Sequence, residues 1–290
     1  MTVVLVPVAM RTVLALHGVS VLVVAALLVC GCETPSSVAR SFAHAHGFEE
    51  EIVTGAGYRH EVWRKAGSPL DPEFHIYVEG DGTPHPSPDT VARDPTPRTP
   101  VMLHLMALDP HASVYVGRPC YWGLYRDAGC SPYIWTQGRF SAPVVQSMVA
   151  VMLKEAAAHP RAGTVIYGHS GGATLALLAA GKGMRPAGIV TIAGNLDPDA
   201  WTRLHKYTPL VGSLNPVRES MTAPLPSIRH YVGSDDNNTP PAFVRAAADQ
   251  IGGEVVVVPG FDHSCCWSQI WPIAAQITFR VPESLQEFRP

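Results

Sequence analysis

Short apolar strands alternate with helices from Phe48 onward, and this alternation limits the fold more than any other feature of the chain. Residues 164–167 and 189–193, for example, read as strands with a helix over 172–180 between them. Such strand–helix–strand units build parallel sheets, and these strands are apolar on both faces, as a sheet covered on both sides requires. No repeat or linker divides the region, so we predict one α/β domain over 48–290. It should be a mostly parallel, twisted sheet with helices on both faces.

The remaining elements follow from apolar periodicity and from proline and glycine breaks. Further strands are expected at 51–54, 60–65, 73–78, 113–117, 228–232 and 254–258. Further helices are expected at 101–108, 142–158, 241–251 and 267–279. Loops are expected at 81–100, 121–140 and 195–223.

Composition excludes two classes of protein. The chain has 290 residues, of which 47% are hydrophobic and 16% charged, so it differs from disordered chains. Its 21 lysines and arginines face 24 acidic residues without a basic run, which argues against nucleic-acid binding.

The N-terminus has the pattern of an export signal. Residues 1–31 contain no acidic residue and one arginine, Arg11, and the apolar run over 21–29 is too short for a membrane-spanning helix. Translation could start at Met1 or at Met10. We expect residues 1–31 to be a signal peptide and 32–47 a tether.

The signal ends in a sequence similar to a bacterial lipobox. Val29 is aliphatic, Cys30 and Gly31 are small, and Cys32 follows, although Cys30 replaces the usual alanine or serine. The similarity implies cleavage before Cys32 and lipidation of its thiol, with a membrane as partner and the bacterial cell envelope as location. Ordinary secretion is the alternative.

Four cysteines remain after this segment: Cys120, Cys130, Cys265 and Cys266. An even number in an exported protein suggests disulfides, and all three pairings stay open. There is no C-x-x-C spacing, so we expect no metal site.

The strongest chemical signal is Gly-His-Ser-Gly-Gly over 168–172, placed between a strand and a helix. The G-x-S-x-G pattern in this context predicts a nucleophile, Ser170, on a tight turn where glycines let the two arms approach. A serine hydroxyl also needs a base and an orienting acid. His263 follows the last strand and is the expected base. Asp236 follows the strand before it and is the expected acid, with Asp235 as the alternative.

Acyl transfer requires hydrogen-bond donors for the oxyanion. We expect one to be the N–H of Gly171. The second should come from the Glu-Gly-Asp-Gly turn over 79–82, through the N–H of Asp81 or of Gly82. The side chains of Glu79 and Asp81 should point away or hold the loop by hydrogen bonds.

The chain resembles the α/β-hydrolase superfamily over about residues 48–285. More narrowly, seven segments resemble bacterial lipoprotein-like α/β-hydrolases of poorly defined substrate: residues 79–82, 94–98, 118–120, 168–172, 193–197, 212–216 and 260–267. The resemblance implies the triad Ser170, Asp236 and His263, and no cofactor. Many relatives have a His-Gly turn where this chain has Glu79-Gly80.

These patterns predict a serine hydrolase that acts on small carboxylic esters or related acyl compounds. A peptidase or amidase with the same triad is one alternative, and a non-catalytic envelope binding protein is another. Aromatic residues of the long loops could bind an acyl group, although most should pack onto the domain.

Overall fold

The computed structural model describes residues 33–68, 70–219 and 226–271. The predicted signal peptide, the lipidation residue Cys32 and the end of the last expected helix lie outside these ranges. No helix within the described ranges is long and apolar enough to cross a membrane.

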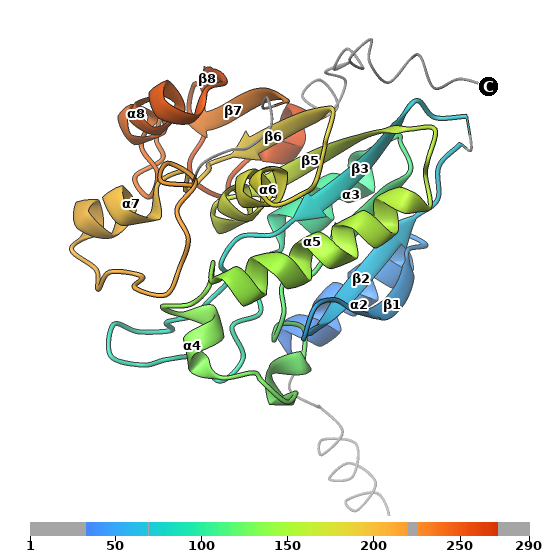
Figure 1. Ribbon diagram of the computed structural model, residues 1–290, viewed down its shortest axis with the longest axis horizontal. Coiled ribbons are helices and arrows are strands. Elements are labelled where there is room, and N and C mark those ends of the chain that lie inside the picture. The colour runs from blue at the N-terminus through green and yellow to red at the C-terminus, as the bar shows by residue number, and fades with distance from the viewer. Residues whose placement is uncertain (1–32, 69, 220–225, 272–290) are drawn as a thin grey trace, which may run out of the picture.

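Eight strands form one sheet in the order β1-β2-β4-β3-β5-β6-β7-β8 (Figure 1). The strands are β1 Glu49–Thr54, β2 Arg59–Lys65, β3 Glu73–Val78, β4 Ser113–Val116, β5 Gly163–His169, β6 Gly188–Ile192, β7 Ser227–Gly233 and β8 Glu254–Val258. Pairing is antiparallel from β1 through β2 to β4 and parallel from β4 to β8. The α/β class and the mostly parallel sheet are therefore confirmed.

Helices cover both faces of this sheet. In Figure 1, α5 and α6 lie in front of the strands and α3 lies behind them. The helices are α2 Pro35–Ala45, α3 Val101–Leu108, α4 Pro132–Trp135, α5 Ala142–Ala157, α6 Gly171–Gly181, α7 Pro198–His205 and α8 Pro241–Ile251, with 3₁₀ turns at Leu124–Arg126 and Trp267–Gln269.

The ordered domain begins before Phe48. The segment expected to be a tether contains α2, whose Ala39 and Ala43 are buried in the core. Arg40 of α2 also pairs with Glu50 of β1 and Glu61 of β2. Proline in the first turn and the capping side chain of Thr34 favour the start of a helix here. The expected domain boundary at residue 48 missed this helix because it was placed at the first expected strand.

Two other elements lie in segments expected to be loops. Helix α7 occupies part of 195–223 and α4 part of 121–140, each with proline in its first turn. The expected closing helix is described only to residue 271 and is a 3₁₀ turn, Trp267–Gln269, over that part.

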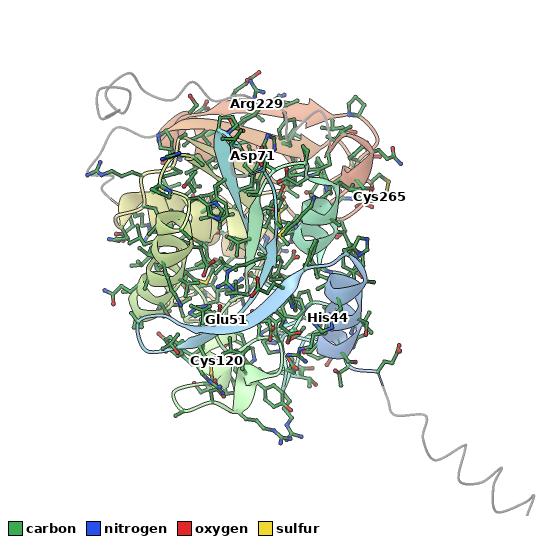
Figure 2. All side chains as sticks on the ribbon, turned by 90° about the vertical axis from the view of Figure 1, so that its right-hand side faces the viewer. His44, Glu51, Asp71, Cys120, Arg229 and Cys265 are labelled. Carbon is green, nitrogen blue, oxygen red and sulfur yellow. A yellow bond between two sulfur atoms is a disulfide. The ribbon has the colours of Figure 1, made fainter. Side chains whose placement is uncertain are left out.

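The structure selects one of the three cysteine pairings. Cys120 bonds to Cys130, and Cys265 bonds to its neighbour Cys266. Figure 2 shows Cys120 and Cys265 far apart on the molecule, which is why the cross-pairings do not form.

Candidate active site

Ser170 lies on the turn that joins β5 to α6, with φ of 51° and ψ of −118°. A positive φ is strained for serine and raises the side chain out of the turn. Two glycines make the turn possible. A Cβ on Gly168 would lie 2.6 Å from the carbonyl oxygen of Gly172, and one on Gly172 would collide with the carbonyl oxygen of Val78.

Two side chains from the ends of other strands form a chain of contacts with Ser170. The first contacts the serine, and the second contacts the first. Nε2 of His263, which follows β8, lies 3.0 Å from the Ser170 Oγ. Nδ1 of the same ring lies 2.9 Å from Oδ2 of Asp236, which follows β7. The parallel strands β5, β7 and β8 end at one edge of the sheet, and so residues 93 positions apart in the chain come into contact.

The structure separates the two candidate acids. Asp235 is exposed and accepts a hydrogen bond from Ser234, whereas Asp236 is buried and faces His263. Asp236 Oδ1 also accepts from the N–H groups of Asn238 and Thr239, and Oδ2 from the Thr239 hydroxyl. These donors hold the carboxylate in place.

The electrostatic environment sets the protonation states of Asp236 and His263. Burial alone would raise the pKa of Asp236, but the hydrogen bond from His263 and those from Thr239 outweigh it and lower the pKa. An ionised Asp236 only accepts, so the His263 Nδ1 carries a proton and Nε2 is free to accept from Ser170. Burial lowers the pKa of His263 and outweighs the opposing effect of Asp236. The ring is therefore neutral at pH 7.

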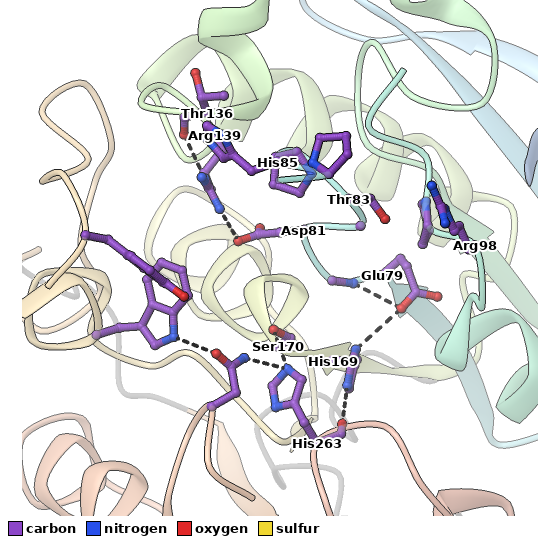
Figure 3. Close-up of a pocket in the computed structure, with 18 of the residues that line it drawn as sticks. Glu79, Asp81, Thr83, His85, Arg98, Thr136, Arg139, His169, Ser170 and His263 are labelled. Atoms are coloured by element: carbon purple, nitrogen blue, oxygen red, sulfur yellow. Dashed lines mark hydrogen bonds and ion pairs between the residues drawn. The ribbon is translucent and has the colours of Figure 1, made fainter. Parts of the chain in front are cut away.

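A cavity of about 900 Å³ opens over Ser170 (Figure 3). Its walls come from the three loops expected to form it, with His85 and Arg98 from the first, Arg139 from the second and Trp201 and Tyr207 from the third. Among the other aromatic residues of these loops, Tyr121, Trp122 and Trp135 are buried in the core, as expected for packing residues, whereas Tyr133 is exposed.

Comparison with solved structures identifies the fold. An esterase from Pyrococcus furiosus has a TM-score of 0.54 at 12% identity, covering 89% of this chain and 96% of that one. A protein of unknown function from Agrobacterium tumefaciens, assigned to the alpha/beta hydrolases, has a TM-score of 0.51 at 16% identity, covering 83% and 100%. Puromycin hydrolase has a TM-score of 0.54 at 15% identity, covering 80% of this chain and 38% of its own.

The chain has the α/β-hydrolase fold. Ser170 after β5, Asp236 after β7 and His263 after β8 lie at the positions at which this fold carries catalytic residues. No protein-family model and no curated protein sequence matches the chain.

In the α/β-hydrolase fold, the N–H following the nucleophile binds the oxyanion. Here it belongs to Gly171, the first residue of α6, where N–H groups lack partners inside the helix. The turn after β3 passes alongside, since a Cβ on Gly80 would lie 3.2 Å from the Ser170 Cβ. The Gly80 N–H is occupied by Glu79 (3.1 Å), whereas the Asp81 N–H has no acceptor among the described residues. Gly82 packs against Pro95 and Pro97.

Both acidic side chains of this turn hold the loop, as expected. The carboxylate of Asp81 accepts from Arg118 and from Arg139, the latter at 2.7 Å. Burial would raise the pKa of Asp81, but Arg139 and Arg118 lower it to about 2. The carboxylate lies directly against Gly171, and the two guanidiniums compensate its negative charge there. Glu79 Oε2 accepts from the N–H of Met102 at 3.0 Å.

Sequence reasoning missed two side chains in contact with His263. The Asn238 Nδ2 lies 2.9 Å from the His263 Nε2, and the His169 Nε2 donates to the main-chain carbonyl of His263 at 2.9 Å. Figure 3 shows His169 between His263 and Glu79, whose Oε1 lies 3.5 Å from the His169 Nδ1. Their position beside the predicted catalytic residues was the only available signal, because nothing in the sequence shows which loop residues meet.

One cluster within the described residues has the composition of a metal site: His75, Asp109 and His111. It lies at the start of β4, at the opposite end of that strand from the edge that carries Ser170. Asp109 Oδ2 accepts from His75 Nδ1 and from the Tyr77 hydroxyl, both at 2.6 Å. Oδ1 accepts from the N–H of His111 and contacts its ring nitrogen. Because protein groups satisfy both oxygens, the cluster fits a buried hydrogen-bond network better than a metal site.

Proposed function

We propose that this protein is a serine hydrolase that cleaves small carboxylic esters through Ser170, His263 and Asp236. The observation that carries the proposal is the unbroken hydrogen-bond chain from Ser170 through His263 to Asp236, at the floor of a cavity of about 900 Å³. A binding protein would not need this arrangement.

The proposed mechanism has two halves. In the first, Ser170 Oγ attacks the ester carbonyl carbon while its proton passes to His263 Nε2, and the negative charge collects on the carbonyl oxygen near the N–H groups of Gly171 and Asp81. The C–O bond to the alcohol then breaks, and Nε2 returns its proton to the leaving oxygen. In the second half, a water molecule repeats these steps on the acyl-enzyme and releases the carboxylic acid.

A peptidase or amidase remains the second candidate. Its support is the similarity to puromycin hydrolase, while the similarity to the Pyrococcus furiosus esterase supports ester hydrolysis. Attack on the carbonyl is common to both reactions, and they differ only in the leaving group. No long apolar helix covers the cavity within the described residues, and this favours small soluble substrates over long-chain lipids.

The decisive experiment combines turnover with active-site labelling. Wild-type protein should hydrolyse short p-nitrophenyl esters and react with a fluorophosphonate probe at Ser170. Ser170→Ala should lose both while keeping its circular dichroism spectrum. Ser131→Ala, an exposed serine before α4, is the matched control and should keep both.

Unlabelled, folded wild-type protein would reject the proposal and favour a binding role. A panel of esters, amides and peptides on the purified domain then separates an esterase from an amidase.

We also propose that the protein is exported and anchored in the bacterial cell envelope by lipid on Cys32. The support is the sequence pattern of residues 1–32, together with two disulfides in the domain, which form in oxidising compartments. Mass spectrometry of membrane fractions should find diacylglycerol on Cys32, and Cys32→Ser should release the protein from the membrane. Unmodified Cys32 would refute lipidation.

A further inference from the structure

Nε2 of His263 is approached by two hydrogen-bond donors. Ser170 Oγ lies 3.0 Å away and Asn238 Nδ2 lies 2.9 Å away. An imidazole nitrogen has one lone pair, so the hydroxyl and the amide compete for the same acceptor. The proposed mechanism uses only the first of these contacts and leaves the second unexplained.

Trp201 determines which way the Asn238 amide faces. Its indole Nε1 lies 3.2 Å from the Asn238 Oδ1, and an indole N–H can only donate. The amide oxygen must therefore face Trp201, and the NH₂ group must face His263.

Helix α7 fixes Asn238 at two points, its side chain and its main chain. Trp201 lies on α7, and His205 of the same helix donates from Nε2 to the Asn238 main-chain carbonyl at 2.8 Å. The Asn238 N–H in turn donates to Asp236. The residue is thus bonded through its side chain and both of its main-chain polar groups, so the amide has little freedom to move away.

We propose that Trp201 and Asn238 form a positioning pair that holds His263 Nε2 as an unprotonated acceptor before substrate binds. A proton on Nε2 would face the amide NH₂, donor against donor. Rotating the amide to relieve this would place its NH₂ against the Trp201 N–H. The pair therefore opposes protonation of His263 from solvent and keeps the ring neutral in the resting site. This role rests on the proposed hydrolase function.

Three ionisable groups also affect the pKa of His263, and the test must leave them unchanged. Asp236 of the β7–α8 loop favours the protonated ring, and so does Asp262, which precedes His263 in the loop after β8. His169 at the end of β5 disfavours it. The pair adds a contact of a different kind, since neither Asn238 nor Trp201 carries a charge. Substitutions of these two residues leave the three ionisable neighbours in place.

The test is a histidine titration by NMR, with the His263 resonance assigned by its loss in His263→Ala. Asn238→Ala should raise the pKa of His263 by about 0.5–1 unit, the size of one lost hydrogen bond. Trp201→Phe removes the indole N–H, keeps an aromatic ring at this position and should also raise the pKa. In the Asn238→Ala background the same change should add nothing, because the two residues act through one contact.

Asn237→Ala is the matched control. Asn237 is the exposed neighbour whose amide bonds to the Asp235 carbonyl and to no other group in the described ranges, so its removal should leave the titration unchanged. An unshifted titration in Asn238→Ala would overturn the inference, and so would a full Trp201→Phe effect without Asn238. Should Asn238→Ala fail to fold, the titration of Trp201→Phe alone decides.

The acid limb of the kcat/KM profile should move to higher pH by the same amount in Asn238→Ala. Failure of the wild-type protein to react with the fluorophosphonate would reject the hydrolase function. The titration of unreacted protein would still decide the role of the pair.

Discussion

Replacing Asp236 with asparagine tests the proposed site most directly. In the wild type, Asp236 Oδ1 accepts from the N–H groups of Asn238 and Thr239 at 2.8 Å each. Asparagine keeps an oxygen that can accept both bonds, so the loop should stay folded. The other oxygen becomes an NH₂ group facing His263. Nδ1 must then accept, which moves the ring proton to Nε2, where it blocks proton transfer from Ser170.

The expected loss follows from this change of tautomer. In a triad of this geometry a wrong tautomer lowers kcat by about 10³–10⁴-fold, or about 4–5.5 kcal/mol in activation free energy. The thermal unfolding midpoint should change little by comparison.

The assay is kcat/KM on a short p-nitrophenyl ester, with Asp235→Asn as the matched control. Asp235 lies one residue away, is exposed, and contacts Ser234 instead of His263, so its variant should stay within a factor of about three of wild type. An Asp236→Asn variant within tenfold of wild type, or an equal loss in Asp235→Asn, would refute the reasoning.

Two predictions concern pH. Activity needs neutral His263, whose pKa is lowered from its ordinary value of about 6.5, so kcat/KM should rise with pH with a midpoint below about 6.5; an acid limb above pH 7 would contradict this. The pKa of Asp81 is about 2 against an ordinary 3.8, so its ion pairs stabilise the fold above pH 3.8 and are lost as the pH falls towards 2. Urea unfolding at pH 5 and pH 2.5 should show a weaker acid loss in Asp81→Asn than in wild type, by about 1–2 kcal/mol, and equal losses would count against the pairing.

Elements with a strong local signal were predicted correctly from the sequence. The strand over Glu73–Val78, the helix over Val101–Leu108 and the helix over Pro241–Ile251 have the expected bounds. Their apolar pattern and their glycine and proline breaks are local properties of the chain. Helices α2 and α7 were missed because one precedes the first strand and the other is a short, largely polar helix in a proline-containing connection.

Within the site, the elbow around Ser170 could be predicted because its glycines and flanking elements adjoin it in the sequence. The sequence favoured Asp236 over Asp235 but left both open, because the outcome depends on which side chain faces the end of β8. The Asn238 contact with His263 was not predicted, nor were the two arginines on Asp81, which lie 37 and 58 residues along the chain.

The sequence alone therefore determined the order of the eight strands, the helices with a strong apolar pattern and the turn around Ser170, since short-range sterics and hydrophobic periodicity govern them. Only the tertiary structure decided the acid, the cysteine pairs and the surroundings of His263. Those contacts join residues distant in the chain, and the register and order of the strands decide which of them meet.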